Sequence, residues 1–205
     1  MDTLGSFVNI KKQDVYFKGC ASCNGHCCDG ANGFSIAPLI LEDFAEVYRY
    51  FPILFHFQHQ QLSAYVLLND GKNPCRYLEK NKCTIYDTRP PACKLYPVSP
   101  YFEEILVDTH CPSINSFEGR VVSQKGILNQ DFHTKRLENF VQKREATRQL
   151  LEQFNRFEDF EYVIDIGNKA FYRYTKVSQN GYMKMHRESL KQLEEMLALS
   201  ETKCS

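Results

Sequence analysis

The sequence predicts an α+β protein, with a small, metal-centred, cysteine-rich core of short strands and hairpins. A long helix, a hairpin and an amphipathic C-terminal helix are expected to follow this core. Eight of the nine cysteines fall within residues 20–111, among glycines, prolines and short apolar runs typical of strands and turns. The rest of the chain carries apolar residues at helical spacing. We therefore expect residues 1–112 to be a cysteine-cluster metal-binding region, and residues 113–205 an extension that packs on it within one compact domain.

Composition and charge exclude several classes of protein. The chain has 205 residues, of which 43% are hydrophobic and 24% charged, as in globular proteins. Its 25 basic side chains balance its 25 acidic ones, so no long-range field attracts nucleic acid or an anionic membrane. No apolar run reaches the roughly 20 residues of a membrane helix, and the N-terminus lacks the pattern of a secretory signal. These features predict a cytoplasmic protein that binds neither nucleic acid nor a membrane.

The N-terminal half predicts short elements between loops. Weak alternation in residues 1–18 predicts a short strand, and the glycine-rich segment 19–33 predicts tight turns in which sulfur atoms can converge. Helical spacing predicts a helix from Ile40 to Phe51, which Pro52 ends, whereas residues 53–61 carry no clear pattern. The next expected elements are a strand and a hairpin with a cysteine on each arm: Ala64–Asn69, then Cys75–Leu78 with Lys82–Tyr86.

Longer elements are expected after residue 90. A helical turn is predicted to begin at Pro90 or Pro91 and to stop before Pro97, because proline fits only the first turn of a helix. The later elements are a strand, a long helix, a hairpin, a last strand and an amphipathic helix: Phe102–Thr109, Asp131–Phe154, Glu161–Ile166 with Lys169–Tyr174, Gly181–Met185 and Arg187–Leu199.

The first set of cysteines is Cys20-x2-Cys23-x3-Cys27-Cys28. A gap of two residues lets one turn present two sulfur atoms to one metal. Disulfides need an oxidising compartment, and inert buried thiols do not explain this spacing in a glycine-rich loop. Metal ligation is the remaining interpretation, and thiolates select zinc, iron–sulfur clusters or copper(I).

The second set is Cys75-x7-Cys83-x9-Cys93, followed by Cys111 directly before a proline. The two sets supply eight thiolates, enough for two four-cysteine sites or for one iron–sulfur cluster with four supporting or second-metal cysteines. The ninth cysteine, Cys204, stands in a polar tail and is expected to take no part.

Both sets together resemble a bacterial family of zinc- or iron-chelating cysteine-cluster proteins, CxxCxxCC. The most specific part is the segment Cys83-Thr-Ile-Tyr-Asp-Thr-Arg-Pro-Pro-Ala-Cys93-Lys-Leu-Tyr-Pro97. Flagellin lysine N-methylase carries a similar signature in a longer chain. The chain departs from the pattern by one additional residue between Cys23 and Cys27. The resemblance implies a metal site over about residues 19–112 and no established reaction.

Charged and histidine side chains next to the cysteines are candidates for supporting roles. A four-thiolate zinc site carries a net negative charge, so Arg89 and Lys94 are expected to neutralise it or to donate hydrogen bonds to sulfur. An ordinary ion pair between Arg89 and Asp87 is the alternative. His26 and His110 each precede a cysteine and could replace one as a ligand, although eight cysteines already suffice.

These features favour a metal-binding protein whose clustered thiolates hold an iron–sulfur cluster that supports a redox or protein-modification reaction. The doubled cysteine and the Cys-Pro pair favour this cofactor, whereas the division of eight into two fours favours zinc. The alternatives are a zinc protein that binds a protein partner, a metal-trafficking protein, or an enzyme like the lysine N-methylase. No catalytic motif is present apart from the metal site, so the sequence leaves enzymatic activity open.

Overall fold

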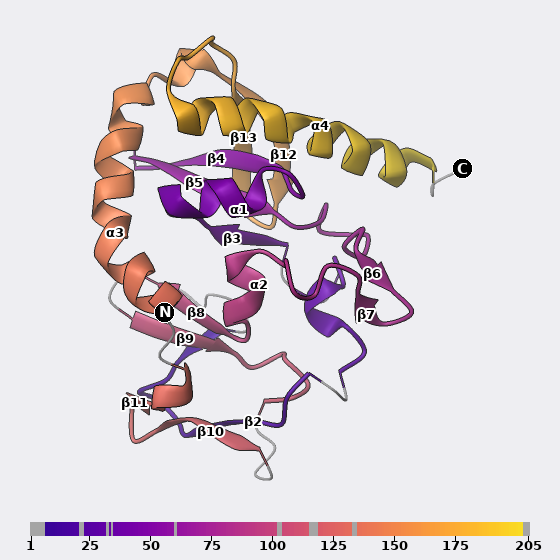
Figure 1. Ribbon diagram of the computed structural model, residues 1–205, viewed down its shortest axis with the longest axis vertical. Coiled ribbons are helices and arrows are strands. Elements are labelled where there is room, and N and C mark those ends of the chain that lie inside the picture. Colours follow the sequence, from indigo (N-terminus) through magenta and orange to yellow (C-terminus); the bar gives the residue numbers. More distant parts are fainter. Residues whose placement is uncertain are drawn as a thin grey trace. The chain divides into compact units, whose positions relative to one another are not determined.

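The structure is a computed structural model, which describes residues 7–20, 23–31, 33, 35–59, 61–101, 104–114, 119–132 and 135–202 (Figure 1). It contains both helices and strands, which confirms the predicted α+β class. The chain folds into two compact units: Met1–Cys27 with Leu78–Gln142, and Cys28–Tyr77 with Lys143–Ser205. The boundary at residue 112, which the cysteine content predicts, stays a prediction. Among the described helices, none is both long and apolar enough to cross a membrane.

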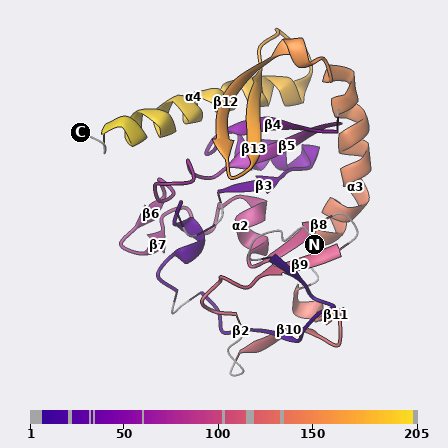
Figure 2. The same cartoon turned by 180° about the vertical axis from the view of Figure 1, so that it is seen from behind.

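The first unit is built from short antiparallel strands, which Figure 2 shows side by side. Its described strands form two three-stranded sheets and one hairpin: β1 (Phe7–Asn9), β9 (Glu104–Asp108) and β8 (Val98–Tyr101); β11 (Ile127–Leu128), β10 (Arg120–Gln124) and β2 (Val15–Phe17); β6 (Leu78–Glu79) and β7 (Lys82–Cys83). The helical segments are η1 (His26–Cys28), whose last residue begins the second unit, α2 (Pro91–Leu95), η3 (Gln130–Phe132) and the first part of α3 (Lys135–Leu151).

A cysteine takes part in the core of this unit. The buried apolar cluster joins both sheets to α2 and α3, and its members are Ile10, Val15, Phe17, Leu95, Val98, Val107, Cys111, Ile114, Val122, Leu128 and Leu137. Because the core includes Cys111, one of the proposed ligands is anchored by the packing that holds the unit together.

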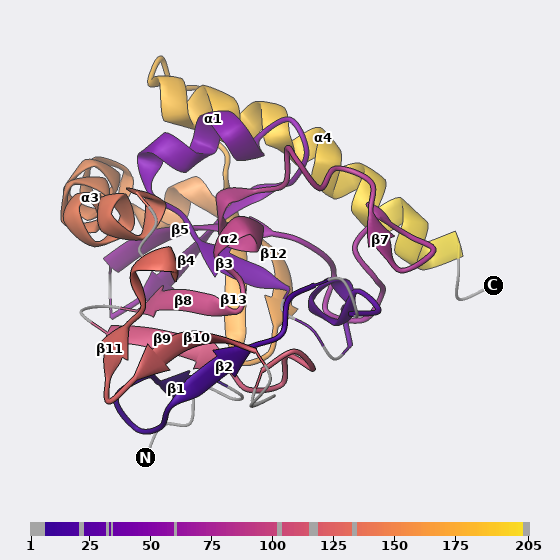
Figure 3. The same ribbon diagram turned by 60° about the horizontal axis from the view of Figure 1, so that its bottom comes forward.

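The second unit is a five-stranded antiparallel sheet with helices packed on it. The strand order is β12 (Phe160–Ile166), β13 (Lys169–Tyr174), β4 (Ile53–Gln58), β5 (Gln61–Leu67) and β3 (Ile36–Pro38). The helical segments are η2 (Leu41–Asp43), α1 (Phe44–Val47), η4 (Glu152–Phe154), η5 (Phe157–Asp159), α4 (Gly181–Thr202) and the second part of α3. Figure 3 shows α1 beside α4, where the rings of Phe44 and Tyr182 meet edge to face at 5.7 Å between centroids.

Helix α4 is attached to the sheet by apolar and buried polar contacts. Leu193 and Met196 pack against Leu54 and Phe171. Closer to the start of α4, His186 is 0% exposed, and its two ring nitrogens hydrogen-bond to the backbone of Tyr174 and Ile53 in the sheet. The long helix, the hairpin and the amphipathic C-terminal helix that the sequence predicts are therefore present as α3, β12–β13 and α4.

The strand predicted at Gly181–Met185 is wrong, because these residues form the first turns of α4. The side-chain Oδ1 of Asn180 accepts hydrogen bonds from the N–H groups of Tyr182 at 2.9 Å and Met183 at 3.3 Å. This is N-capping, which satisfies N–H groups that a helix otherwise leaves unpaired and so fixes where the helix begins.

Two other segments differ from expectation. The helix predicted over Ile40–Phe51 is only a 3₁₀ turn followed by the four residues of α1. At its start, Leu41 N–H donates to Thr147 Oγ1 and Ile40 N–H donates to Asp43 Oδ2. Residues 53–58, which had no assigned element, form strand β4 at the middle of the sheet.

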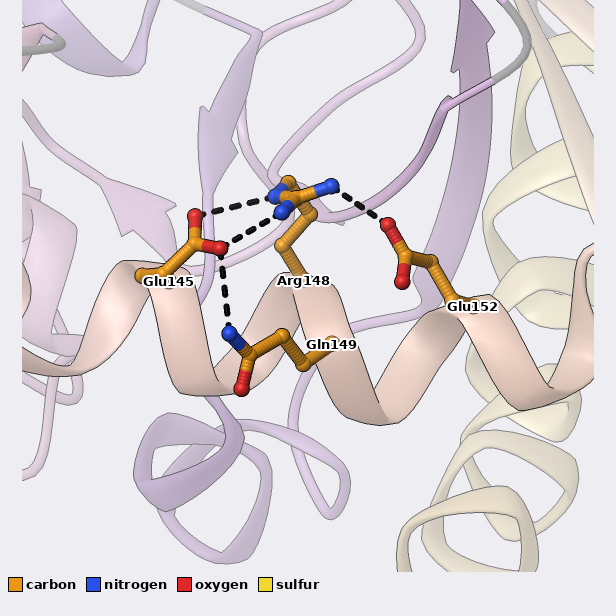
Figure 4. Close-up of polar contacts among 4 residues, drawn as sticks. All are labelled: Glu145, Arg148, Gln149 and Glu152. Atoms are coloured by element: carbon orange, nitrogen blue, oxygen red, sulfur yellow. Dashed lines mark hydrogen bonds and ion pairs between the residues drawn. The ribbon is translucent and has the colours of Figure 1, made fainter.

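The exposed face of α3 in the second unit carries an ion-pair network (Figure 4). The guanidinium of Arg148 donates to both carboxylate oxygens of Glu145, at 2.9 and 2.5 Å, and also to Glu152, while Gln149 donates to Glu145. The charged heads of this helix thus pair with one another at the surface, where such pairs contribute little to stability.

Candidate metal centre

Backbone pairing brings the first and last of the eight cysteines to one place in the first unit. Lys18 N–H donates to Ser113 O at 2.9 Å, and Ser113 Oγ–H donates to Gly19 O at 2.7 Å. Cys20 directly follows one of these segments and Cys111 lies two residues before Ser113. Two cysteines that are 91 positions apart therefore flank the same pair of hydrogen bonds.

The first set folds as two successive turns. Cys23 N–H donates to Cys20 O at 3.1 Å, which closes the turn expected for a two-residue gap. Gly25 then has φ +76°, a conformation that favours glycine, and it leads into the 3₁₀ turn η1. The turn η1 carries His26, Cys27 and the first cysteine of the second unit.

The thiol of Cys111 is buried in the apolar cluster of the first unit, with polar groups nearby. It is 5% exposed, and burial is the largest cause that raises its pKa. The backbone N–H of Ser113 and the nearby hydroxyl of Tyr96 lower this pKa, whereas Cys23 and Cys20 raise it further. Thiols that disfavour each other's ionisation in this way are stabilised as thiolates by a bound cation.

The half-buried Tyr96 and the buried Asp108 form a polar pair beside this thiol. Tyr96 O–H donates to Asp108 Oδ2 at 2.9 Å, while Asp108 Oδ1 accepts from His110 N–H at 3.0 Å. Burial raises the pKa of Tyr96 most, and Asp108, Cys111 and Cys27 in their ionised forms raise it further. Cys27 and Cys111 thus lie close enough to the same hydroxyl to act on it.

The two remaining cysteines of the first unit are half-buried. Cys83 lies on β7 opposite Leu78, in a hairpin whose turn residues Lys80 and Asn81 both have positive φ. A Cβ added to Gly25 would lie 2.6 Å from Leu78 Cδ1, so this hairpin packs against the turn that leads into η1. Cys93 lies on α2, two residues before the buried Leu95.

The second unit holds the other two cysteines side by side. Cys75 N–H donates to Cys28 O at 2.7 Å. Two residues away on both segments, Gly30 meets Asn73 so closely that a Cβ would lie 2.1 Å from Asn73 O. Only glycine allows this backbone approach, so Gly30 is required for the pairing of the two cysteine segments.

A polar turn fixes the Cys75 segment. Asp70 Oδ1 accepts from the N–H groups of Lys72 at 2.9 Å and Asn73 at 2.6 Å, and Asp70 Oδ2 accepts from Asn73 Nδ2 at 2.7 Å. These hydrogen bonds stabilise the charged form of Asp70 and lower its pKa, against the opposing and larger single contribution of burial. The turn holds Asn73 against Gly30 and so positions Cys75, which is 8% exposed.

Residues 19–117 match the family model CxxCxxCC, whose description is "Putative zinc- or iron-chelating domain". This similarity covers 99 of the 205 residues, which we call the CxxCxxCC domain. The domain covers all eight cysteines of both sets, and it confirms that metal is the cofactor class. No curated protein and no solved structure matches the chain, so the similarity to flagellin lysine N-methylase stays an expectation.

The two basic residues expected to support the CxxCxxCC domain have different surroundings. Arg89 places its guanidinium 3.7 Å from the centre of the Tyr86 ring and donates to Tyr86 O at 2.9 Å. Arg89 thus stabilises the turn between Cys83 and Cys93, and a contact with a metal-bound sulfur remains a prediction. Lys94 is exposed on α2, and its role stays a prediction as well.

Two polar residues of the domain were missed from the sequence. Tyr96 lies in the specific segment itself, three residues after Cys93, but its contact with Cys111 depends on the fold. Arg76 directly follows Cys75, pairs with Glu195 at 2.7 Å and keeps its Nη1 buried with no hydrogen-bond partner among the described residues. Position next to a cysteine was the only sequence signal for Arg76.

The donor set of the CxxCxxCC domain fits a thiophilic metal. Across the described residues, no three His, Cys, Asp or Glu side chains already surround a common point closely enough to hold an ion. Binding of a metal to these thiolates would be coupled to the local structure. Cys204 lies outside the described residues.

Proposed function

We propose that the CxxCxxCC domain holds an iron–sulfur cluster on its cysteine thiolates and that the cluster serves a redox or protein-modification reaction. The ligands we assign are drawn from the two cysteine sets, Cys20, Cys23, Cys27, Cys28, Cys75, Cys83, Cys93 and Cys111. One observation carries the proposal: Cys20 and Cys23 lie near the buried thiol of Cys111 from the other end of the domain, where hydrogen bonds from Lys18 and Ser113 join the two segments.

The surroundings of Cys111 support a cluster. Hydrogen bonds to sulfur and shielding from solvent are the means by which proteins set the reduction potential of an iron–sulfur cluster. Cys111 is buried, and the backbone N–H of Ser113 and the hydroxyl of Tyr96 lie near its thiol. The same donors would support a zinc thiolate, but zinc has no reduction potential to adjust.

The division of the cysteines also favours a cluster over two closed zinc sites. A pair of four-thiolate sites was the sequence argument for zinc. The first unit contains six of the eight cysteines and the second contains Cys28 and Cys75, so the units do not separate them into two fours. One cluster with supporting cysteines agrees better with this division.

Anaerobic purification followed by metal analysis tests the proposal. We expect a brown protein with broad sulfide-to-iron absorption and with iron and acid-labile sulfide in equal amounts. Cys111→Ser should lose this absorption, whereas Cys204→Ser is the matched control and should keep it. A colourless protein with stoichiometric zinc would overturn the iron–sulfur proposal and favour a structural zinc site. A protein without metal would overturn both.

A further inference from the structure

His26 lies inside the first set of cysteines, which no other histidine of the chain does. The family name prescribes cysteines at positions 1, 4, 7 and 8 of the motif. Counted from Cys20, these positions are Cys20, Cys23, residue 26 and Cys27, and residue 26 is a histidine. Aligned in this way, His26 takes the position of the third cysteine of the motif and Cys27 takes the position of the fourth.

The surroundings of His26 agree with this alignment. Its Nε2 is buried and has no hydrogen-bond partner among the described residues. Buried ring nitrogens are normally satisfied, and an unsatisfied one points to a bound water or ion at that place. His110, the other histidine that directly precedes a cysteine, is instead exposed.

The local backbone presents His26 from the same turn as the thiols. Gly25 has φ +76° and starts η1 at His26, three residues after Cys23. Consecutive residues of a 3₁₀ turn point in different directions. His26 and Cys27 are therefore not expected to reach the same metal ion.

We infer that His26 binds the metal through Nε2, in a centre that it shares with the thiolates of Cys20, Cys23 and Cys111. Three thiolates and one imidazole are an established ligand set for zinc, and imidazole also replaces thiolate in some iron–sulfur clusters. This inference rests on the proposed metal binding, but not on which metal is bound. Cys27 then is not a ligand of this centre; it lies near Tyr96 or binds a second metal site.

X-ray absorption at the K-edge of the metal that the purified full-length protein holds tests the inference. We expect imidazole scattering beside sulfur neighbours in the wild type, and its loss in His26→Cys, which restores the family pattern and should keep the metal. His26→Ala should weaken metal affinity by about 100-fold or more, above the range of residues that only support a ligand. If the metal is an iron–sulfur cluster, His26→Cys should also lower its reduction potential, since imidazole ligands raise it.

His110→Ala is the matched control, and it should keep both the imidazole scattering and the affinity. A metal-loaded wild type with sulfur neighbours alone would overturn the inference and leave the proposed metal binding standing. A wild type that holds no metal would overturn both. Because the wild-type spectrum decides by itself, the test does not depend on whether each variant folds.

Discussion

Cys28 and Cys75 are 47 positions apart, yet the N–H of Cys75 donates to the carbonyl oxygen of Cys28 at 2.7 Å. The two cysteine sets are thus joined by their backbones in the second unit, independently of any metal. The close approach of Gly30 to Asn73 continues the same contact. A bound metal would add to a contact that the backbone already makes.

Gly30→Ala should break this contact. The added Cβ would meet backbone atoms of Asn73 at 2.1 to 2.9 Å, and backbone cannot move aside as a flexible side chain can. We expect the free energy of unfolding to fall by about 1–3 kcal/mol, the usual cost of overpacking. Urea unfolding measures this loss, and hydrogen exchange at the Cys75 amide should accelerate. Gly181→Ala is the control, because a Cβ there meets nothing within 4 Å; an equal loss in both variants would refute the explanation.

Tyr96→Phe should destabilise the first unit. Removal of the hydroxyl leaves Asp108 Oδ2, in a side chain that is 3% exposed, without the hydrogen bond of 2.9 Å that it now accepts. An unsatisfied buried acceptor costs about 1–3 kcal/mol, and thermal unfolding of the metal-free protein should reveal this loss. Tyr86→Phe lies in the same segment at a side chain that is 50% exposed, and it should leave stability unchanged. Unchanged stability of Tyr96→Phe would mean that water replaces the hydroxyl.

The sequence predicted those parts of the fold that depend on local signals. The hairpin around Gly167 followed from two alternating runs and a turn, and α4 followed from the spacing of Leu190 and Leu193. Strand β4 was missed because Ile53, Leu54 and Phe55 are all buried, so the run has no alternation. The start of α4 was mistaken for a strand because its cap depends on one side chain, that of Asn180.

The candidate site likewise has a part that the sequence predicts and a part that depends on the fold. The sequence predicted the eight cysteines as ligands from the short gaps of the first set and from the specific segment between Cys83 and Pro97 in the second. The contacts that bring the sets together come from residues without a metal-binding pattern, such as Gly30 against Asn73 and Tyr96 against Asp108. These are long-range contacts that one sequence does not reveal, and the same is true of the buried nitrogen of His26.

The second unit should lose stability in mild acid through His186. Burial, the largest cause, lowers the pKa of His186 to about 4 from 6.5, and the hydrogen bonds of its ring to Ile53 O and Tyr174 N–H oppose this shift. A histidine with a lowered pKa stabilises the fold fully above pH 6.5. That contribution is lost as the pH falls from 6.5 towards 4, and amounts to about 3 kcal/mol.

Urea unfolding of the metal-free protein between pH 7 and pH 4 checks the size of this loss. His186→Gln removes the titrating group, so the stability of this variant should depend less on pH. Burial also lowers the pKa of His56, but this side chain is only half-buried. His56→Gln should therefore reduce the pH dependence less than His186→Gln does. Equal slopes in the wild type and in His186→Gln would show that other groups cause the loss of stability.

Metal removal should loosen the first unit more than the second. The segments around Cys20 and Cys111 are far apart in the sequence but are joined by two hydrogen bonds, from Lys18 and Ser113, and a metal on the nearby thiolates would add to them. Structural zinc sites contribute on the order of 10 kcal/mol to folding, so a loss of several kcal/mol is expected here. The five-stranded sheet and α4 bury their own apolar cluster around Phe171 and should be less affected.

Hydrogen exchange with and without a chelator measures this difference: protection should fall in residues 17–20 and 111–114 and persist in β4, β5 and β13. Cys111→Ser should reproduce the metal-free pattern, whereas Cys204→Ser should not. Uniform loosening of both units would mean that the chain unfolds as one cooperative body, and unchanged protection around Cys111 would mean that the metal is peripheral to the fold.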